Sequence, residues 1–474
     1  MFFRQIRDAN LAQYAYLIGC QETGDAIVID PERDIDRYID IAEQEGLNIT
    51  AAADTHIHAD YLSGLREFAE RGAKVYASDE GGDDWRYEWL LNSNSYYYKL
   101  LKHDETFKIG NIEFKALHTP GHTPEHISFL VTDGAASSDA MGLLSGDFIF
   151  VGDVGRPDLL DSAAGYTETM KPAAKTLHKS IESFKDLPEY LQVWPAHGAG
   201  SACGKALGAV PDSTVGYELR NNASIEASDR EDRFVDFILT GQPEPPLYFG
   251  RMKRDNKKGP DVLGTIPDPP HLVFEHVKQK AQSKKSVVLD TRSISDFMSG
   301  HIPNSLLAPF NKSFPTVAGS YVGEDESIIL LCDQRDLHQI VLNLIRIGLD
   351  NIEGYITPES MKKQWENDRK SIFESIETIR FSQTQPLIDE GAEVLDVRKK
   401  SEYDEVHIPG ARNIAHTRLA DSREQLEADT TYLVHCRMGG RSAVASAYLK
   451  RKGYEVYFID DFLVDHLKTL EKVG

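Results

Sequence analysis

The stretch DTHIHADYLSG, residues 54–64, places His56, His58 and Asp60 at alternate positions directly after the short apolar run ITAAAD, residues 49–54. A short apolar run of this composition predicts a buried strand. Residues two apart in an extended chain point the same way, so we expect the three side chains to converge near the strand's carboxyl end. Two imidazoles and a carboxylate on one side of a strand predict a metal site.

Three further ligand candidates also follow apolar runs. His122 follows FKAL within the segment HTPGHTPEH, Asp147 follows GLLSG, and His197 follows LQVWPA. Polar residues on loops at the ends of core strands are what a preorganised site needs. One histidine of this kind is usually a capped loop residue, but six candidates in the same context predict a metal centre.

The motifs THIHADY, TPGHT, SGD and PAHG, in this order over residues 1–245, resemble the metallo-β-lactamase superfamily, which includes glyoxalase II and persulfide dioxygenase branches. The resemblance implies an αββα sandwich with the site at one edge of two packed sheets. The apolar runs YAYLIG and AIVIDP flank the turn QETGD, and this pattern predicts an opening β-hairpin.

Tyr61 stands where the binuclear members of that superfamily have a further histidine. A phenol with an ordinary pKa of about 10 is a poor ligand at neutral pH, which favours one metal. His56, His122 and Asp147 then make the two-histidine, one-carboxylate set of non-haem Fe(II) oxygenases, and persulfide dioxygenases use the matching positions for iron. We expect one Fe(II) per chain, with four neighbours orienting ligands or substrate: His58, Asp60, His197 and Tyr61.

A second kind of chemistry is predicted by VHCRMGGRSAVASAYLKRKGY, which places Cys436 between an apolar strand and a helix. Its glycines let backbone N–H groups curl round the sulfur. The helix N-terminus, Arg437 and Arg441 favour a thiolate or the terminal sulfur of a persulfide. Together with EVLDVRKKSEYDEVHIPGARNI upstream, this loop resembles a rhodanese active site, over residues 372–474.

The chain contains an internal repeat. VVLDTRSISDFMSGHIPNSLLAP echoes EVLDVRKKSEYDEVHIPGARNIAH, so residues 271–371 predict a first, degenerate rhodanese-like domain. Its loop, CDQRDLHQ, lacks glycine and sets Asp333 and Asp336 beside Cys332, where negative charge disfavours a thiolate. We expect Cys332 to be inactive and this domain to act as a spacer or docking element.

A chain of 474 residues fits about three domains. Residues 246–270, rich in Pro, Gly and Lys, predict a linker between the first two. Four scattered cysteines, no secretory leader and no long apolar run favour a soluble, cytoplasmic protein without membrane partners. The net charge of −23 weighs against nucleic acid. We also expect a homo-oligomer.

Two further residues are candidates for binding substrate or relaying sulfur. Arg156, in VGRPDLL, is a candidate anion contact, with a structural salt bridge as the alternative. Cys203 follows His197 by six residues and is a candidate sulfur relay, or else a packed small side chain. Cys20, in the predicted hairpin, is taken as structural.

The resemblances imply a persulfide dioxygenase joined to a sulfurtransferase, acting in sulfide and persulfide detoxification. The iron domain would oxidise a low-molecular-weight thiol persulfide with O2 to sulfite, and sulfane sulfur on Cys436 would convert sulfite to thiosulfate. Two alternatives stay open. One is a binuclear zinc thioesterase of the glyoxalase II kind with an accessory sulfurtransferase, and the other is a non-catalytic persulfide carrier. The sequence leaves the identity of the thiol open.

Overall fold

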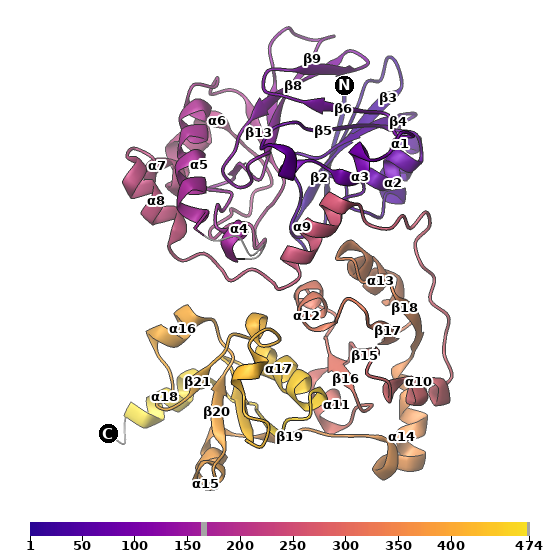
Figure 1. The fold of residues 1–474 in the computed structure, drawn as a ribbon, viewed down its shortest axis with the longest axis vertical. Helices are drawn as coiled ribbons and strands as arrows, with labels where there is room; N and C mark the ends of the chain where they lie inside the picture. Colours follow the sequence, from indigo (N-terminus) through magenta and orange to yellow (C-terminus); the bar gives the residue numbers. More distant parts are fainter. Residues whose placement is uncertain (163–167, 472–474) are drawn as a thin grey trace. The chain divides into compact units, whose positions relative to one another are not determined.

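The computed structural model describes residues 1–162 and 168–471. The chain forms two compact units (Figure 1). Unit 1 is Met1–Ile266 with Ile345–Gly348, and unit 2 is Pro267–Leu344 with Leu349–Gly474. Each unit is described by itself.

Unit 1 is built around two six-stranded sheets. In the first, β1 to β3 run antiparallel and β3 to β6 run parallel. The pairing of β2 with β3 confirms the predicted opening hairpin. The strands of this sheet are β1 (Phe2–Arg7), β2 (Tyr14–Gly19), β3 (Asp25–Ile29), β4 (Asn48–Ala53), β5 (Lys74–Ser78) and β6 (Tyr98–Leu101).

The second sheet has the order β14-β13-β10-β9-β8-β7. The only parallel pair along this order joins β10 to β13, within the described residues. Its strands are β7 (Thr106–Ile109), β8 (Ile112–His118), β9 (Ile127–Asp133), β10 (Gly142–Gly146), β13 (Gln192–Pro195) and β14 (Ser213–Thr214). A small ribbon pairs β11 (Ile149–Phe150) with β12 (Asp153–Val154).

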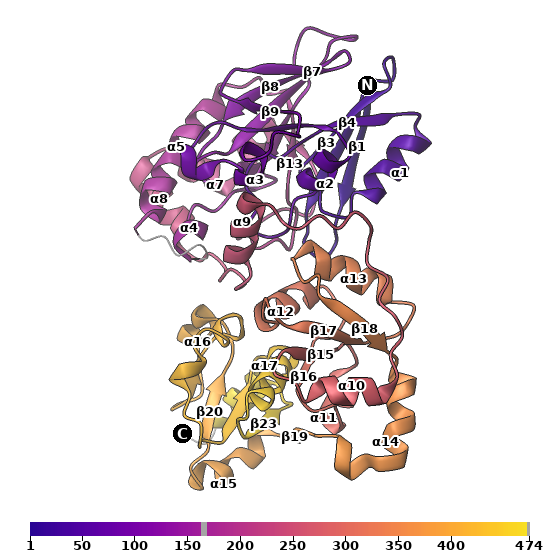
Figure 2. The same cartoon turned by 45° about the vertical axis from the view of Figure 1, so that its right-hand side comes forward.

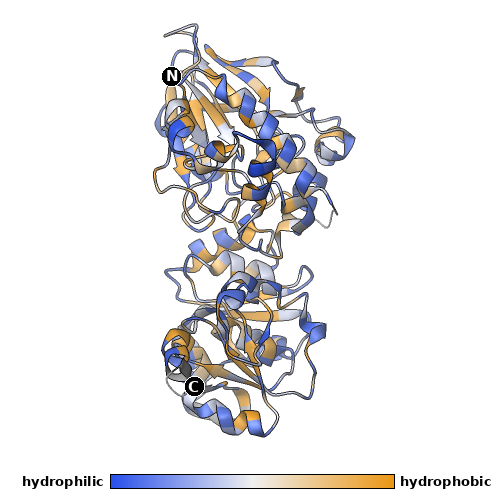
Figure 3. Cartoon of the chain, turned by 90° about the vertical axis from the view of Figure 1, so that its left-hand side faces the viewer, coloured by the Kyte–Doolittle hydropathy of each residue, from blue (hydrophilic) through white to orange (hydrophobic). Residues whose placement is uncertain are grey.

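Apolar side chains of the two sheets pack against each other, including Tyr16 and Ile27 of the first and Phe114 and Phe129 of the second. The outer face of the first sheet packs on α1 and α2, and that of the second on α5 and α8. Figure 2 shows these layers from a second side, and Figure 3 shows hydrophobic residues concentrated along the strands. The predicted αββα sandwich is confirmed. The helices are α1 (Asp36–Gln44), α2 (Leu65–Glu70), α3 (Glu88–Leu91), α4 (Leu159–Ser162), α5 (Met170–Lys185), α6 (Val215–Asn221), α7 (Ala223–Ala227) and α8 (Glu231–Leu239).

The segment expected to be a linker, residues 246–270, instead contains helix α9 (Phe249–Lys258) within unit 1. Its buried residues, Phe249, Met252 and Asn256, are spaced for one helical face. Lysines and arginines fill most of the other positions, and this basic, polar composition is why the segment resembled a linker. The polar residues form the exposed side of an amphipathic helix.

Unit 2 contains two parallel sheets, one from each copy of the repeat, and it confirms the predicted tandem α/β arrangement. The first has the order β16 (Ser305–Leu307), β15 (Ser286–Asp290), β17 (Ser327–Leu331), β18 (Ile352–Ile356). The second has the order β19 (Glu377–Ile379), β23 (Val456–Ile459), β22 (Tyr432–His435), β20 (Glu393–Asp396), β21 (Arg412–Asn413).

Helices flank the strands in both copies, but the position of α12 in the first copy is taken by two 3-10 turns in the second, His416–Arg418 and Arg423–Gln425. Those of the first are α10 (Phe274–Ala281), α11 (Ile294–Ser299), α12 (Phe314–Tyr321), α13 (Leu337–Arg346) and α14 (Pro358–Ile372). Those of the second are α15 (Thr384–Asp389), α16 (Lys400–Glu405), α17 (Gly440–Arg451) and α18 (Leu463–Glu471). In the described part of the chain, every helix is too short or too polar to cross a bilayer.

Candidate metal centre and cysteine loop

The predicted metal ligands lie on loops that follow core strands at one edge of the sandwich. His56 follows β4, His122 follows β8, Asp147 follows β10 and His197 follows β13. Each is at most 2% exposed. The glycine of the SGD motif is required by close packing, because a Cβ at Gly146 would come within 2.7 Å of His126 Nε2 and of Thr55 Oγ1.

His56, His122 and Asp147 form one group whose ligand atoms all lie within 4.8 Å of one another. Asp147 Oδ2 is 3.4 Å from His122 Nε2 and 4.0 Å from His56 Nε2. His122 Nδ1 donates to Arg156 O at 2.9 Å, which leaves its Nε2 lone pair for a cation. The structure therefore brings together the three ligands that the sequence predicted for iron.

His56 is oriented by a chain of hydrogen bonds. Thr55 Oγ1 donates to Asp30 Oδ2 at 3.1 Å and lies 3.0 Å from His56 Nδ1. Because the hydroxyl proton is used on Asp30, the hydroxyl oxygen accepts from His56 Nδ1. This leaves His56 Nε2 unprotonated and facing Asp147, as a metal ligand requires.

The buried charges fit a cation. Neither carboxylate oxygen of Asp147 has a hydrogen-bond partner among the described residues. Burial raises the pKa of Asp147 to about 6 and lowers that of His122 to about 3. A buried carboxylate without partners is costly, and a bound cation would relieve that cost. Neutral imidazoles and one carboxylate are a suitable donor set for a divalent transition metal.

Asp60, His197 and Cys203 form a second group of potential ligands within 4.8 Å of one another. His197 Nε2 lies 3.3 Å from Asp60 Oδ2 and 3.4 Å from Asp147 Oδ1. Burial, then the charges of Asp147 and Asp60, raise the pKa of the Cys203 thiol well above its usual range. Cys203 thus faces the centre, as the relay hypothesis requires, but its surroundings keep the sulfur protonated unless a metal binds.

His58 belongs to a third group, with Asp30 and Asp54. His58 Nε2 is 3.1 Å from Asp30 Oδ1, and although burial lowers the pKa of His58, the charge of Asp30 raises it to about 9. His58 therefore belongs to a different group of potential ligands from His56, although the centroids of the two rings lie only 4.3 Å apart. The reason is that β4 ends at Ala53, so strand alternation does not continue through residues 54–64.

Tyr61 is fully buried and is held away from a ligand role. Its ring stacks on His58 with centroids 4.4 Å apart, and its hydroxyl donates to Asp30 O and accepts from Gln13 Nε2, each at 3.2 Å. Burial raises the pKa of Tyr61 well above its usual value. The side chain is therefore a neutral phenol used for packing and hydrogen bonding.

Two positioning residues were missed by the sequence reasoning. Asn256 of α9 donates from Nδ2 to His58 O at 2.8 Å and to Tyr61 O at 2.7 Å, and its Oδ1 accepts from Ser63 N at 2.8 Å. His126 Nε2 accepts from Asp147 N at 2.9 Å. The final His of HTPGHTPEH was available as a signal for His126, whereas nothing local marks Asn256.

Arg156 forms the salt bridge that was the alternative to a substrate contact. Its guanidinium donates to both carboxylate oxygens of Asp158, at 2.8 and 2.6 Å, and to Ala202 O at 3.1 Å. The residue is 1% exposed. The side chain therefore holds the loop whose backbone carbonyl orients His122.

Cys436 lies between β22 and α17, as predicted. Its Sγ accepts from Gly439 N at 3.2 Å and from Ser442 Oγ at 3.4 Å. Arg441 forms a bidentate pair with Glu402, which raises the pKa of Arg441 and lowers that of Glu402 to about 2. The neighbouring Cys436 further raises the pKa of Arg441. Arg437 lies on the exposed side of the loop. Ser442 and Glu402 were not foreseen.

The shared Asp-x-Arg and His-Ile-Pro motifs are structural in both copies. Arg292 pairs with Asp290 and donates to Gly300 O, as Arg398 pairs with Asp396 and donates to Val406 O. Cys332 is completely buried, and burial together with Asp333 and Asp336 raises its pKa to about 12. Cys20 is also buried, where its Sγ accepts from Asn111 N at 3.4 Å.

Comparison with known proteins agrees with both units. The model of the metallo-beta-lactamase superfamily matches residues 9–197, and that of the rhodanese-like domain matches residues 274–357 and 382–465. The solved structure of a metallo-beta-lactamase from Staphylococcus aureus subsp. aureus COL is 42% identical, with a TM-score of 0.67, and the match covers 76% of this chain and 99% of that one. The chain belongs to the metallo-beta-lactamase superfamily.

Two curated relatives match part of this chain. The mitochondrial persulfide dioxygenase ETHE1 of Bos taurus is 26% identical over 203 residues, which cover 42% of this chain and 68% of the relative. Glyoxylase B2 of Dictyostelium discoideum is 25% identical over 215 residues, which cover 43% and 67%. The two family models confirm the predicted order of a metallo-beta-lactamase domain followed by two rhodanese-like domains.

Proposed function

We propose that the protein is a persulfide dioxygenase coupled to a sulfurtransferase, which oxidises low-molecular-weight thiol persulfides with O2 to sulfite and yields thiosulfate. The observation that carries the proposal is the buried group of His56, His122 and Asp147, in which the carboxylate has no hydrogen-bond partner among the described residues. Two further observations support the proposal. The chain is similar to a persulfide dioxygenase, and backbone Gly439 N–H donates to the sulfur in the Cys436 loop.

One Fe(II) held by His56, His122 and Asp147 would supply open coordination positions for a persulfide and O2. The protein's own part is to prepare the ligands. Arg156 O and Thr55 Oγ1 accept hydrogen bonds from Nδ1 of His122 and His56, respectively, which leaves Nε2 of each ring free to bind a metal. His126 holds the Asp147 backbone, and burial of all three ligands excludes bulk water from the centre.

The rhodanese half would carry sulfane sulfur on Cys436. Gly439 N–H and Ser442 O–H donate to Sγ, so they stabilise negative charge on either a thiolate or a persulfide. Attack of sulfite on the sulfane sulfur breaks the S–S bond, releases thiosulfate and returns the Cys436 thiolate. The two activities would benefit from lying in one chain, because the sulfurtransferase consumes the sulfite that the dioxygenase produces.

The binuclear zinc thioesterase is the second candidate, and one observation favours it. Asp60 Oδ2 and His197 Nε2 are buried without hydrogen-bond partners among the described residues, as unfilled metal ligands would be. Against it, the position of the missing histidine holds Tyr61, a neutral phenol with its hydroxyl already bonded. The third alternative, a non-catalytic persulfide carrier, would use Cys436 alone. It does not explain why His56, His122 and Asp147 are buried together.

The test is metal content combined with O2 uptake on several thiol persulfides. His122→Ala should lose iron and O2 uptake but keep transfer of sulfur from thiosulfate to cyanide, because Cys436 lies in the other unit. His103→Ala, an exposed histidine of the same unit, is the matched control. Two zinc ions per chain with thioester hydrolysis would instead establish the hydrolase, and iron with full turnover in His122→Ala would overturn the ligand assignment.

We also propose the substrates, the cellular location and the oligomeric state that the sequence led us to expect. The substrates are a thiol persulfide and O2, the protein acts in the cytoplasm as a homo-oligomer, and neither nucleic acid nor membrane is a partner. Size-exclusion chromatography with light scattering tests the oligomer directly.

A further inference from the structure

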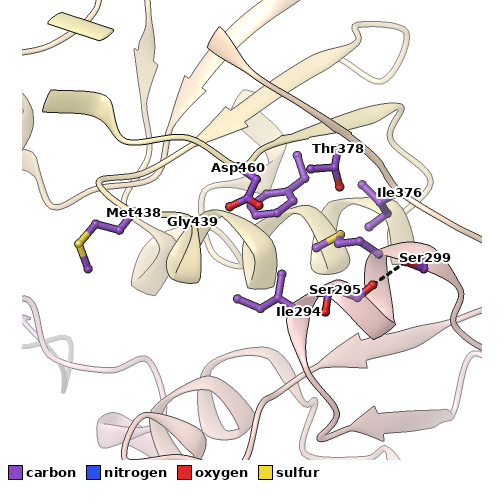
Figure 4. A pocket seen from close by; sticks show the side chains of 10 residues that line it. Ile294, Ser295, Ser299, Ile376, Thr378, Met438, Gly439 and Asp460 are labelled. Atoms are coloured by element: carbon purple, nitrogen blue, oxygen red, sulfur yellow. Dashed lines mark hydrogen bonds between the residues drawn. The ribbon is translucent and has the colours of Figure 1, made fainter. Parts of the chain in front are cut away.

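Unit 2 contains a cavity of about 520 Å³ beside the Cys436 loop, and both copies of the rhodanese-like repeat line it (Figure 4). Helix α11 of the degenerate copy forms one wall, and the Cys436 loop and the end of β23 form another. The lining residues are Ile294, Ser295, Met298, Ser299, Ile376, Thr378, Met438, Gly439, Phe458 and Asp460. A volume of this size is that of a small-molecule site.

The cavity reaches the backbone that holds the reactive sulfur. Gly439 lines the cavity, and its N–H donates to Cys436 Sγ at 3.2 Å. The φ of Gly439 is +94°, a backbone conformation that residues with a side chain rarely adopt. A Cβ at this position would lie 3.2 Å from Asp460 Oδ1. Met438, the preceding residue, is 66% exposed. A molecule in the cavity therefore lies beside the loop that presents the sulfur.

The lining has a definite chemical character. Five side chains are apolar, three carry hydroxyls, and Asp460 supplies the one charge among the ten described lining residues. The two arginines of the loop, Arg437 and Arg441, are not among the lining residues, and Arg441 is paired with Glu402. A cavity whose described lining carries a carboxylate and no cation repels anions and attracts an ammonium group.

We propose that this cavity binds the body of a low-molecular-weight thiol that carries an ammonium group, while the sulfur of that thiol exchanges sulfane sulfur with Cys436. Asp460 pairs with the ammonium, and the apolar side chains contact the carbon chain. The proposal rests on the sulfur transfer proposed for Cys436 and specifies its thiol partner.

The exchange is balanced without a further redox partner. The thiolate of the small thiol attacks the terminal sulfur of the Cys436 persulfide. A new S–S bond forms, the bond between Cys436 Sγ and the sulfane sulfur breaks, and Cys436 leaves as a thiolate. In the reverse direction the small persulfide loads Cys436, so one site serves both steps.

The proposal also gives the degenerate copy a task. Ser295 and Ser299 lie on α11, and Ser299 Oγ donates to Ser295 O at 2.7 Å, a bond drawn in Figure 4. These residues face the catalytic copy across the cavity. The degenerate copy is then one wall of a binding site, which requires its position on α11 but not a reactive Cys332.

The experiment uses the full chain, loaded with sulfane sulfur from thiosulfate. Discharge of the loaded protein is followed with cysteamine, 2-mercaptoethanol and 3-mercaptopropionate, which are cationic, neutral and anionic. Each rate is divided by the parent's rate with the same thiol, so differences in intrinsic nucleophilicity cancel. Asp460→Asn should lower the preference for cysteamine over 3-mercaptopropionate by about two- to fivefold, the size of one exposed ion pair.

A second variant tests the cavity itself. Ser295→Phe should raise the cysteamine concentration for half-maximal discharge by about tenfold, because a phenyl ring fills much of the space that a small ligand uses. Two matched controls should behave as the parent. Glu455→Gln removes an exposed charge that does not line the cavity, and Gln279→Phe adds a phenyl ring at an exposed position of α10.

The outcomes separate this inference from the function on which it rests. Failure of thiosulfate to load Cys436 overturns both. Normal loading with an unchanged thiol preference in Asp460→Asn overturns the ammonium assignment, and unchanged half-maximal concentrations in Ser295→Phe show that the thiol binds elsewhere. A drop in cysteamine preference together with weaker cysteamine binding in Ser295→Phe supports the site.

Discussion

Replacing Asn256 by alanine should release the loop that carries the metal ligands. The amide of Asn256 is 1% exposed and joins α9 to His58, Tyr61 and Ser63 by three hydrogen bonds of 2.7 to 2.8 Å. The loop from Thr55 to Gly64 has no regular secondary structure to hold it. Its geometry therefore depends on such contacts from outside.

The size of the effect follows from the number of partners. Asn256→Ala leaves two carbonyl oxygens and one N–H buried without their partner. Each costs about 1 kcal/mol at the low end of measured values, so unit 1 should lose roughly 3 kcal/mol. At about 2–4 °C per kcal/mol, its unfolding temperature should fall by roughly 6–12 °C. Asn256→Asp should be at least as harmful, because a carboxylate would face the two carbonyl oxygens.

Three measurements check this prediction: the unfolding transition of unit 1, iron content after anaerobic purification, and hydrogen exchange of amides 55–64. Exchange in this loop should accelerate and iron content should fall. The control is Asn221→Ala, which replaces an exposed asparagine whose amide donates to Tyr217 O. This control should change neither the exchange rates in the loop nor the iron content. Parental iron content and exchange rates in Asn256→Ala would refute the assignment of Asn256 as a positioning residue.

The remaining predictions concern Cys436, Tyr61 and Cys332. Cys436→Ser should still consume O2 but release sulfite where the parent releases thiosulfate, with Arg441→Ala between them; an unchanged product ratio at low persulfide and early times would show that the sites are not coupled through Cys436. Tyr61→His should raise zinc content above one per chain, because it restores a neutral nitrogen where binuclear members of the superfamily have a histidine. A zinc content that stays at one would mean that Tyr61 does not limit the site. Cys332 should resist iodoacetamide below pH 9 while Cys436 reacts, because only the thiolate is alkylated and burial with Asp333 and Asp336 raises the pKa of Cys332 to about 12, so the reactive form appears only as pH approaches that value. Mass spectrometry identifies the modified cysteine, and Cys332→Ser should leave sulfur transfer to cyanide unaltered.

The metal ligands were predictable because each lies just past an apolar strand, and strand ends at one edge of a sandwich meet. The resemblance placed His56, His122 and Asp147 in one set, and the structure brings these three side chains together. The grouping of His58 with Asp30 and Asp54 was not predictable, since it depends on where β4 stops. The end of β4 is set by its pairing with β3 and β5, and no local sequence pattern predicts where that pairing stops.

The repeat shows the same division. Its motifs predicted two rhodanese-like copies, one with a glycine-rich cysteine loop and one without. The pairing of Arg441 with Glu402 was not visible, because the partners are 39 residues apart and meet only when α16 and α17 pack on the sheet. The cavity between the copies likewise depends on how α11 faces the Cys436 loop.

The sequence by itself determined which chemistry the chain carries: a set of metal ligands after core strands, and a cysteine at the start of a helix. These features are local, since strand alternation, glycine conformations and helix N-termini act over a few residues. The tertiary structure alone decided that His58 pairs with Asp30, that Asn256 of α9 holds the ligand loop, and that Arg156 is structural. Those outcomes arise from contacts between residues far apart in the chain, and only the packed fold brings their atoms within bonding distance.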